Sequence, residues 1–148
     1  MPAFYDYSMR NRTYRFYTGE ALYPFGFGLT YSKCEITNFT ADKDTAKVTV
    51  KNTGKYDTGE VIELYLKDKD SVLAPPNPVL CGFKRISLTA GEKKEFIIKL
   101  DPNAFTVVDD GGNRIPGSGD WTLYAGFGTP DSRTEVLGGL KAVSVKLG

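Results

Sequence analysis

Hydrophobic and polar residues alternate with a period of two along most of the chain from residue 33 onward. One-sided alternation of this kind is typical of antiparallel strands that bury one face and leave the other in water. The segments predicted to be strands are residues 33–41, 47–51, 61–67, 81–88, 95–100, 105–109, 121–127 and 142–147. The apolar residues expected on the buried faces of the four clearest segments are Val48, Val50, Ile62, Leu64, Leu66, Phe96, Ile98, Leu100, Val143, Val145 and Leu147.

The breaks between these segments are rich in residues that favour turns. Residues 52–60 and 109–120 supply Gly, Asn and Asp, which tolerate positive φ. No segment shows a helical period. Seven or eight short strands therefore predict an all-β fold, an antiparallel Greek-key β-sandwich of immunoglobulin or fibronectin type III kind. The Cys–Trp–Cys spacing of a true immunoglobulin domain is absent, which favours the fibronectin-like version.

The first part of the chain, residues 1–32, has a different character, and we call it the aromatic arm. It contains ten of the nineteen aromatic residues of the chain. Pro24, Gly26 and Gly28 interrupt its last stretch, YPFGFGLTY, and exclude a regular helix there. The sequence thus predicts an arm over residues 1–32 and a sandwich over residues 33–148.

An arm with so many rings is expected to be packed against a surface. One aromatic side chain buries roughly 150–250 Å², and a soluble monomer seldom exposes an apolar patch above roughly 300–600 Å². The surface that covers the arm is its own sandwich, a second domain or another chain. For residues 23–31, packing against the chain's own sandwich is as strongly expected as packing against a neighbour. For residues 4–17, a neighbour outside the chain is favoured.

Composition and charge exclude several functional classes. The formal net charge is +1 and basic residues are scattered among acidic ones, so no nucleic-acid partner is predicted. No window approaches the ~18 apolar residues of a membrane span, so no membrane partner is predicted either. The chain is expected to be soluble. The first residues lack the pattern of a signal peptide, but a signal on a longer parent stays open, and with it a cytoplasmic or a secreted location.

Residues that bind metals are scarce. The chain has no histidine, which removes the commonest metal ligand and the commonest general base. Its two cysteines, Cys34 and Cys81, could form one disulfide if their Cα atoms lie within about 7 Å, but two half-buried free thiols are favoured. We therefore predict no metal site and no cofactor.

Pairs of carboxylates occur in the sequence, but their positions are typical of turns. Glycosidic chemistry needs two carboxylates about 5–10 Å apart. At turns and strand ends Asp commonly bonds to nearby backbone, so a structural role is favoured for each pair and no catalytic residue is predicted. The segment DKDS, residues 68–71, lacks the loop length of a dedicated calcium site. The carboxylate pairs are Asp109 with Asp110, Asp57 with Glu60, and Asp68 with Asp70.

Trp121 is expected in the core or at an edge rather than on a sugar-binding platform.

Four long segments resemble one protein family, in the order in which they occur. They are RTYRFYTGEALYPFGFGLTYS (residues 12–32), VKNTGKYDTGEVIELYLKD (50–68), LCGFKRISLTAGEKKEFIIKL (80–100) and GDWTLYAGFG (119–128). Together they are similar to the C-terminal fibronectin type III-like domain of family 3 glycoside hydrolases. Cys81 departs from the family pattern, which more usually has a charged or polar residue there. The RTYRFYTG and TPDSRTEVLGG segments look more like the β-xylosidase branch than the β-glucosidase branch.

The resemblance implies a non-catalytic accessory domain of an exo-acting retaining β-glycosidase in carbohydrate metabolism. The catalytic aspartate and glutamate of that family lie on other domains, and no position here matches their motifs. The implied partners are the catalytic domains of the parent enzyme, with a homo-oligomer through the aromatic arm as a second option. The alternative function is an independent carbohydrate-binding or adhesive sandwich. The residues expected to pack at the interdomain joint are Tyr14, Phe16, Tyr17, Tyr23, Phe25 and Phe27.

Overall fold

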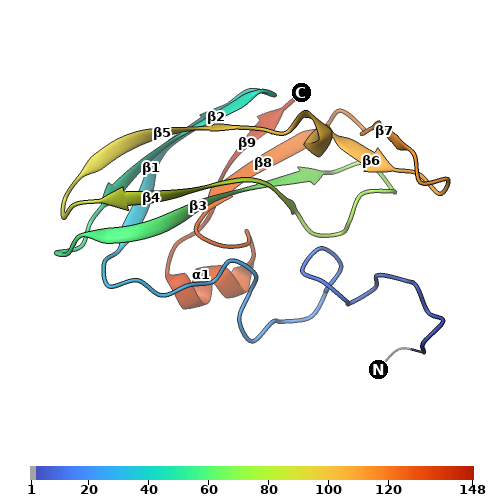
Figure 1. Ribbon diagram of the computed structural model, residues 1–148, viewed down its shortest axis with the longest axis horizontal. Coiled ribbons are helices and arrows are strands. Elements are labelled where there is room, and N and C mark those ends of the chain that lie inside the picture. The colour runs from blue at the N-terminus through green and yellow to red at the C-terminus, as the bar shows by residue number, and fades with distance from the viewer. Residues whose placement is uncertain (1–2) are drawn as a thin grey trace.

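Two antiparallel sheets face each other in the computed structural model, which describes residues 3–148. Figure 1 shows the aromatic arm below them, outside the sandwich and beside the single α-helix. The first sheet has the order β1-β2-β5. Its strands are β1 (Cys34–Ala41), β2 (Thr45–Asn52) and β5 (Lys93–Lys99).

The second sheet has four strands in the order β4-β3-β8-β9. They are β4 (Val79–Leu88), β3 (Thr58–Asp68), β8 (Trp121–Gly126) and β9 (Val143–Leu147). The long strand β3 lies inside the sheet, where it pairs with both β4 and β8. A bulge between Leu64 and Tyr65 shifts the register with β4. The all-β antiparallel sandwich expected from the alternation is thus confirmed.

The core between the sheets is formed by the residues that the alternation places on the inner faces. Val48, Val50, Ile62 and Leu64 are fully buried. The other predicted core residues of β3 and β5 are buried as well, and in β9 Leu147 is buried while its two valines are half-buried. Burial of a side chain of this size contributes about 1.5–3 kcal/mol. For these four segments the period-two pattern therefore predicted both the strand and the face that packs into the core.

The structure has nine strands, one more than the upper limit expected from the sequence. The additional strand, β7 (Arg114–Pro116), falls in a segment expected to be a turn and pairs with the short strand β6 (Thr106–Val108). A 3₁₀ helix, η1 (Pro102–Phe105), takes Phe105 from the strand predicted over residues 105–109. Strands of three residues are too short to show alternation, which explains why β7 was not predicted.

One α-helix, α1 (Ser132–Gly138), corrects the expectation that no segment is helical. The Asp131 side chain caps its first turn by accepting a hydrogen bond from the Thr134 N–H at 2.7 Å. Gly139 ends it in the left-handed conformation, with φ 68°, where glycine carries no steric penalty. Two turns of helix bury no residue completely, so the segment shows no helical hydrophobic period.

Candidate interdomain surface

Part of the aromatic arm, between residues 14 and 26, lies on the outer face of the four-stranded sheet. Outward-facing residues of β3 alternate with Leu64 and Leu66, which point into the core. One of them, Tyr65, is nevertheless fully buried, and Glu63 is only 9% exposed. The ring of Tyr14 in the aromatic arm meets the Tyr65 ring edge-on, with centroids 6.3 Å apart. The outer face of β3 is therefore covered by the arm rather than by water.

Two rings of the aromatic arm form the seat against the sheet. Tyr14 and Phe25 stack with centroids 4.2 Å apart and an interplanar angle of 10°. The hydroxyl of Tyr14 accepts a hydrogen bond from the Leu80 N–H on β4 at 3.0 Å. Offset aromatic pairs add about 0.5–1.5 kcal/mol to the burial of their area. Tyr14 thus joins the arm to the sheet through both packing and a hydrogen bond.

Backbone carbonyls of the aromatic arm are held by side chains of the sandwich. Asn77, in the loop before β4, donates from Nδ2 to the carbonyls of Tyr14 and Tyr17, both at 2.7 Å. Thr129, in the loop between β8 and α1, donates its N–H and its hydroxyl to the Phe25 carbonyl, at 3.1 and 3.2 Å. These bonds fix the path of the arm over residues 14–25 even though it contains no regular secondary structure.

A buried polar pair lies beneath Gly26. The Tyr65 hydroxyl donates to Glu63 Oε2 at 2.7 Å. Burial raises the pKa of the Glu63 carboxyl, and the hydrogen bond from Tyr65 offsets part of that rise. Burial and the bond to Glu63 likewise raise the pKa of Tyr65. Gly26 has φ 80°, and a Cβ there would overlap the Glu63 carboxylate, so the close approach of the arm requires glycine.

The end of the aromatic arm is pinned where it enters β1. Ser32 is buried, and its hydroxyl donates to Asn52 Oδ1 at 2.7 Å. Asn52, itself fully buried, donates from Nδ2 to the carbonyls of Tyr56 (2.7 Å) and Thr89 (3.1 Å). A buried amide satisfied in this way stabilises the corner. Between the seat and this corner, residues 28–31 are exposed.

The six residues predicted for the joint fall into two groups. Tyr14, Phe16 and Phe27 are half-buried, whereas Tyr17, Tyr23 and Phe25 are 40%, 66% and 45% exposed. Tyr23 and Phe27 stack on each other with centroids 5.5 Å apart. The structure therefore brings Tyr14 and Phe25 onto the sheet and leaves much of the Tyr23–Phe27 pair facing outward.

Further apolar side chains of the aromatic arm remain uncovered. Leu29 is 87% exposed and Tyr31 is 96% exposed. Phe4, Tyr5 and Tyr7, near the beginning of the arm, are exposed as well. Together with Tyr23, they are large apolar or aromatic side chains that no other residue of the described chain covers well.

Three residues that hold the aromatic arm were not predicted from the sequence. Asn77 and Thr129 lie in loops and act through hydrogen bonds to backbone, which no residue pattern reveals. Tyr65 did carry a signal. It is a large aromatic residue at an outward position of a strand whose other face is apolar, so it indicated that the outer face of β3 is covered too.

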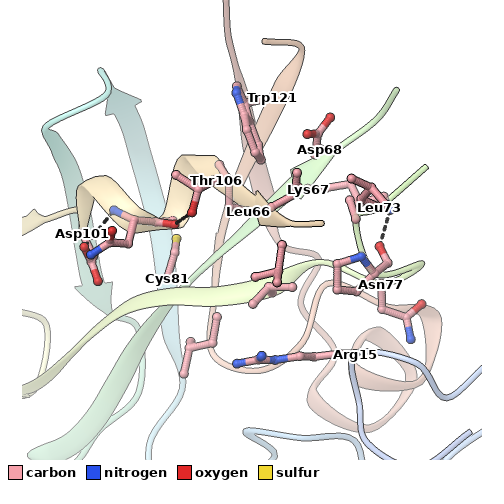
Figure 2. A pocket seen from close by; sticks show the side chains of 18 of the residues that line it. Arg15, Leu66, Lys67, Asp68, Leu73, Asn77, Cys81, Asp101, Thr106 and Trp121 are labelled. Carbon is pink, nitrogen blue, oxygen red and sulfur yellow. Dashed lines mark hydrogen bonds between the residues drawn. The ribbon is translucent and has the colours of Figure 1, made fainter. Parts of the chain in front are cut away.

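A hollow of about 670 Å³ lies between the aromatic arm, the beginning of β4 and β6. Figure 2 shows Arg15 on one side of it and Trp121 on the other. Lys67 Nζ donates to the Pro75 carbonyl at 2.7 Å, and burial lowers the pKa of this lysine. Trp121 is buried and packs edge-on against Phe105, with centroids 5.5 Å apart. Trp121 is thus part of the core, as predicted, and not an exposed platform.

The carboxylates considered for chemistry bond to nearby backbone. Asp68 accepts hydrogen bonds from the Ser118 N–H at 2.9 Å and from the Asp70 and Ser71 N–H groups at 3.3 Å. Burial acts to raise the pKa of Asp68, but these bonds and the Ser118 hydroxyl hold it below its usual value. Asp109 accepts from the Asn113 N–H at 2.8 Å. Both carboxylates therefore organise turns.

Both cysteines are free, Cys34 buried and Cys81 half-buried. Burial raises the pKa of Cys34 to about 11 and that of Cys81 to about 12. Within residues 3–148, no three His, Cys, Asp or Glu side chains come together as a group able to hold a metal ion. In the same range, no helix has the length and hydropathy needed to cross a membrane.

Comparison with known proteins shows which proteins this chain resembles. The family model described as "Fibronectin type III-like domain" matches residues 60–128. The chain is 38% identical over 103 residues to the thermostable β-glucosidase B of Acetivibrio thermocellus, covering 62% of this chain and 14% of that protein. It is 33% identical over 121 residues to a β-xylosidase of Formosa agariphila, covering 76% of this chain and 17% of that protein.

Solved structures give the same result for the fold. A β-glucosidase from Streptomyces venezuelae in complex with D-glucose superposes with a TM-score of 0.74 at 28% identity, covering 91% of this chain and 18% of that one. A glycoside hydrolase family 3 β-glucosidase from Bifidobacterium adolescentis gives a TM-score of 0.68 at 28% identity, covering 84% and 18%. The chain thus spans less than one fifth of the length of each of these relatives.

Proposed function

Because this chain belongs to the fibronectin type III-like domains of family 3 glycoside hydrolases, we propose that it is a non-catalytic accessory domain of such an enzyme, a β-xylosidase or a β-glucosidase. In this role it packs against the catalytic domains and stabilises them. The division into an aromatic arm of residues 1–32 and a sandwich of residues 33–148 belongs to the same proposal.

The observation that carries the proposal is the two-sided aromatic arm. One side, formed by Tyr14 and Phe25, is stacked and tied to the sheet. The other side presents the stacked rings of Tyr23 and Phe27. Uncovered aromatic area of this size on an ordered segment is typical of a surface that another protein part covers. The relatives, more than five times as long as the stretch they share with this chain, supply such a part.

Tyr23→Ala in the full-length enzyme tests the docking role. A ring buried at the joint should cost about 3–5 kcal/mol of stability when removed, whereas the same change in the isolated 148-residue chain should cost less than about 1 kcal/mol. Tyr56→Ala is a matched control, because Tyr56 is also 66% exposed but lies between β2 and β3. Equal shifts for both variants in the full-length enzyme would contradict the proposal.

Activity of the isolated chain provides a second test. The purified chain should hydrolyse neither aryl β-xylosides nor aryl β-glucosides above background. It should also show no saturable binding to xylan or cellulose. Turnover by the chain alone would overturn the accessory role, and saturable binding that is lost on replacing exposed aromatic residues would favour an independent carbohydrate-binding module.

A further inference from the structure

A second hollow, of about 530 Å³, lies at the end of the sandwich where the aromatic arm enters β1. Its walls come from the end of the arm, the beginning of β1, the segment after β8 and α1 with the residues that follow. Most of the side chains that line it are apolar. They include Phe27, Leu29, Ile36, Phe127, Leu137 and Leu140.

Glu60 is one of two glutamates that line this hollow. Its Oε1 accepts a hydrogen bond from the Val61 N–H at 3.0 Å, and Oε2 has no hydrogen-bond partner among residues 3–148. None of the three ion pairs found within residues 3–148 includes Glu60. Burial raises the pKa of this carboxyl, which is the response of an acid that lacks a compensating cation.

The other charged residues of the hollow do not neutralise Glu60. Lys33 and Lys141 are both exposed, and Lys141 Nζ lies 3.9 Å from Glu135 Oε1 instead. Glu35, on β1, adds a second half-buried carboxylate. The hollow therefore combines aromatic and aliphatic walls with a negative group that has an unused acceptor oxygen.

We propose that this hollow binds an arginine side chain contributed by the remainder of the glycosidase polypeptide. A guanidinium group is weakly hydrated, stacks on aromatic rings such as those of Phe27 and Phe127, and makes charge-assisted hydrogen bonds to carboxylates. A lysine ammonium is more strongly hydrated and suits apolar walls less well. Leu29 and Tyr31, which line the mouth of the hollow, are almost fully exposed, as expected of a rim that the same neighbour covers. This inference rests on the proposed function and adds the chemistry of a second contact.

Titration of the isolated chain with benzamidinium tests the recognition chemistry directly, with the neutral isostere benzamide as the comparison. Amide NMR shifts of residues around the hollow should report benzamidinium binding at least tenfold tighter than benzamide. Glu60→Gln should abolish that preference, whereas Glu35→Gln, which changes the other carboxylate of the hollow, should keep it. Equal affinities for the two probes, or a preference that survives Glu60→Gln, would overturn the proposal.

The effect of Glu60→Gln on stability tests whether the cation comes from the parent polypeptide. In the isolated chain the thermal midpoint should stay the same or rise at neutral pH, because the substitution removes a half-buried charge that has no cation beside it. In the full-length enzyme it should fall by several degrees, because the arginine loses its partner. A midpoint that does not fall there rejects the arginine contact. A fall after Tyr23→Ala in the same enzyme would still support the accessory role, so the two failures are distinguishable.

Discussion

Replacement of Tyr14 by alanine measures how firmly the aromatic arm belongs to the sandwich. Tyr14 is half-buried, so it removes roughly 100 Å² from water, worth about 2.5 kcal/mol at about 25 cal/mol per Å². Its contacts with the rings of Phe25 and Tyr65 add about 0.5–1.5 kcal/mol. The hydrogen bond from the Leu80 N–H adds about 1 kcal/mol. Because the unfolded chain already buries part of this area, we expect a total loss of about 3 kcal/mol.

Urea unfolding of the isolated chain, followed by the fluorescence of buried Trp121, is a suitable assay. Tyr14→Phe removes only the hydroxyl and should cost about 1 kcal/mol. Tyr7→Ala is the control, because Tyr7 is an exposed residue of the same arm and its loss should change stability by less than about 0.5 kcal/mol. If the loss of stability caused by Tyr14→Ala is as small as that caused by Tyr7→Ala, the arm does not contribute to the stability of the sandwich and the reasoning is refuted.

Three further predictions concern Gly26, Glu63 and the two cysteines. Gly26→Ala should lower the free energy of unfolding in urea by more than about 1 kcal/mol, because Gly26 has a positive φ and a Cβ there would contact Glu63. Gly28→Ala is the control and should cost little, because there is open space around Gly28. Similar costs for the two variants would contradict this account. Glu63→Gln should gain stability over the wild type as pH rises above 4.5, the ordinary pKa of the group, and the gain should level off above its raised pKa. A stability gain of Glu63→Gln that grows as pH falls would contradict this prediction. Cys34 and Cys81, with pKa values raised to about 11 and 12, should react far more slowly with iodoacetamide at pH 8 in the folded than in the unfolded chain, and fast labelling would mean that neither is protected.

Alternation predicted the strands well because the core between the two sheets selects apolar residues at every second position. Val48 and Val50 show this in β2, as Ile62 and Leu64 do in β3. An element that is too short for a period carries no such signal in its residue pattern. The three-residue strand β7 and the two-turn helix α1 depend on tertiary pairing and on end caps, so their hydrophobic pattern could not predict them.

The candidate surface was predictable in part. An excess of rings in residues 1–32 indicated a packed arm, and glycines and prolines indicated an irregular path. The division of those rings could not be predicted, because it depends on partners from distant positions. Tyr14 lies inward because Tyr65 and Asn77 on the sandwich contact it, whereas Tyr23 stacks on Phe27 and stays 66% exposed.

The proposed docking role explains why the sandwich fixes the aromatic arm so firmly. A flexible arm would lose about 0.5–1.5 kcal/mol for each side chain that becomes ordered on docking. Here the carbonyl of Phe25 accepts two hydrogen bonds from Thr129, and the ring of Tyr14 is fixed on the sheet. Folding of the domain therefore already orders these groups, and docking need not order them again. Residues such as Tyr65, which would touch no catalytic domain, then influence docking through the arm that they support. Under the proposed function, the sandwich would contribute to the joint by holding the arm in the conformation that docks.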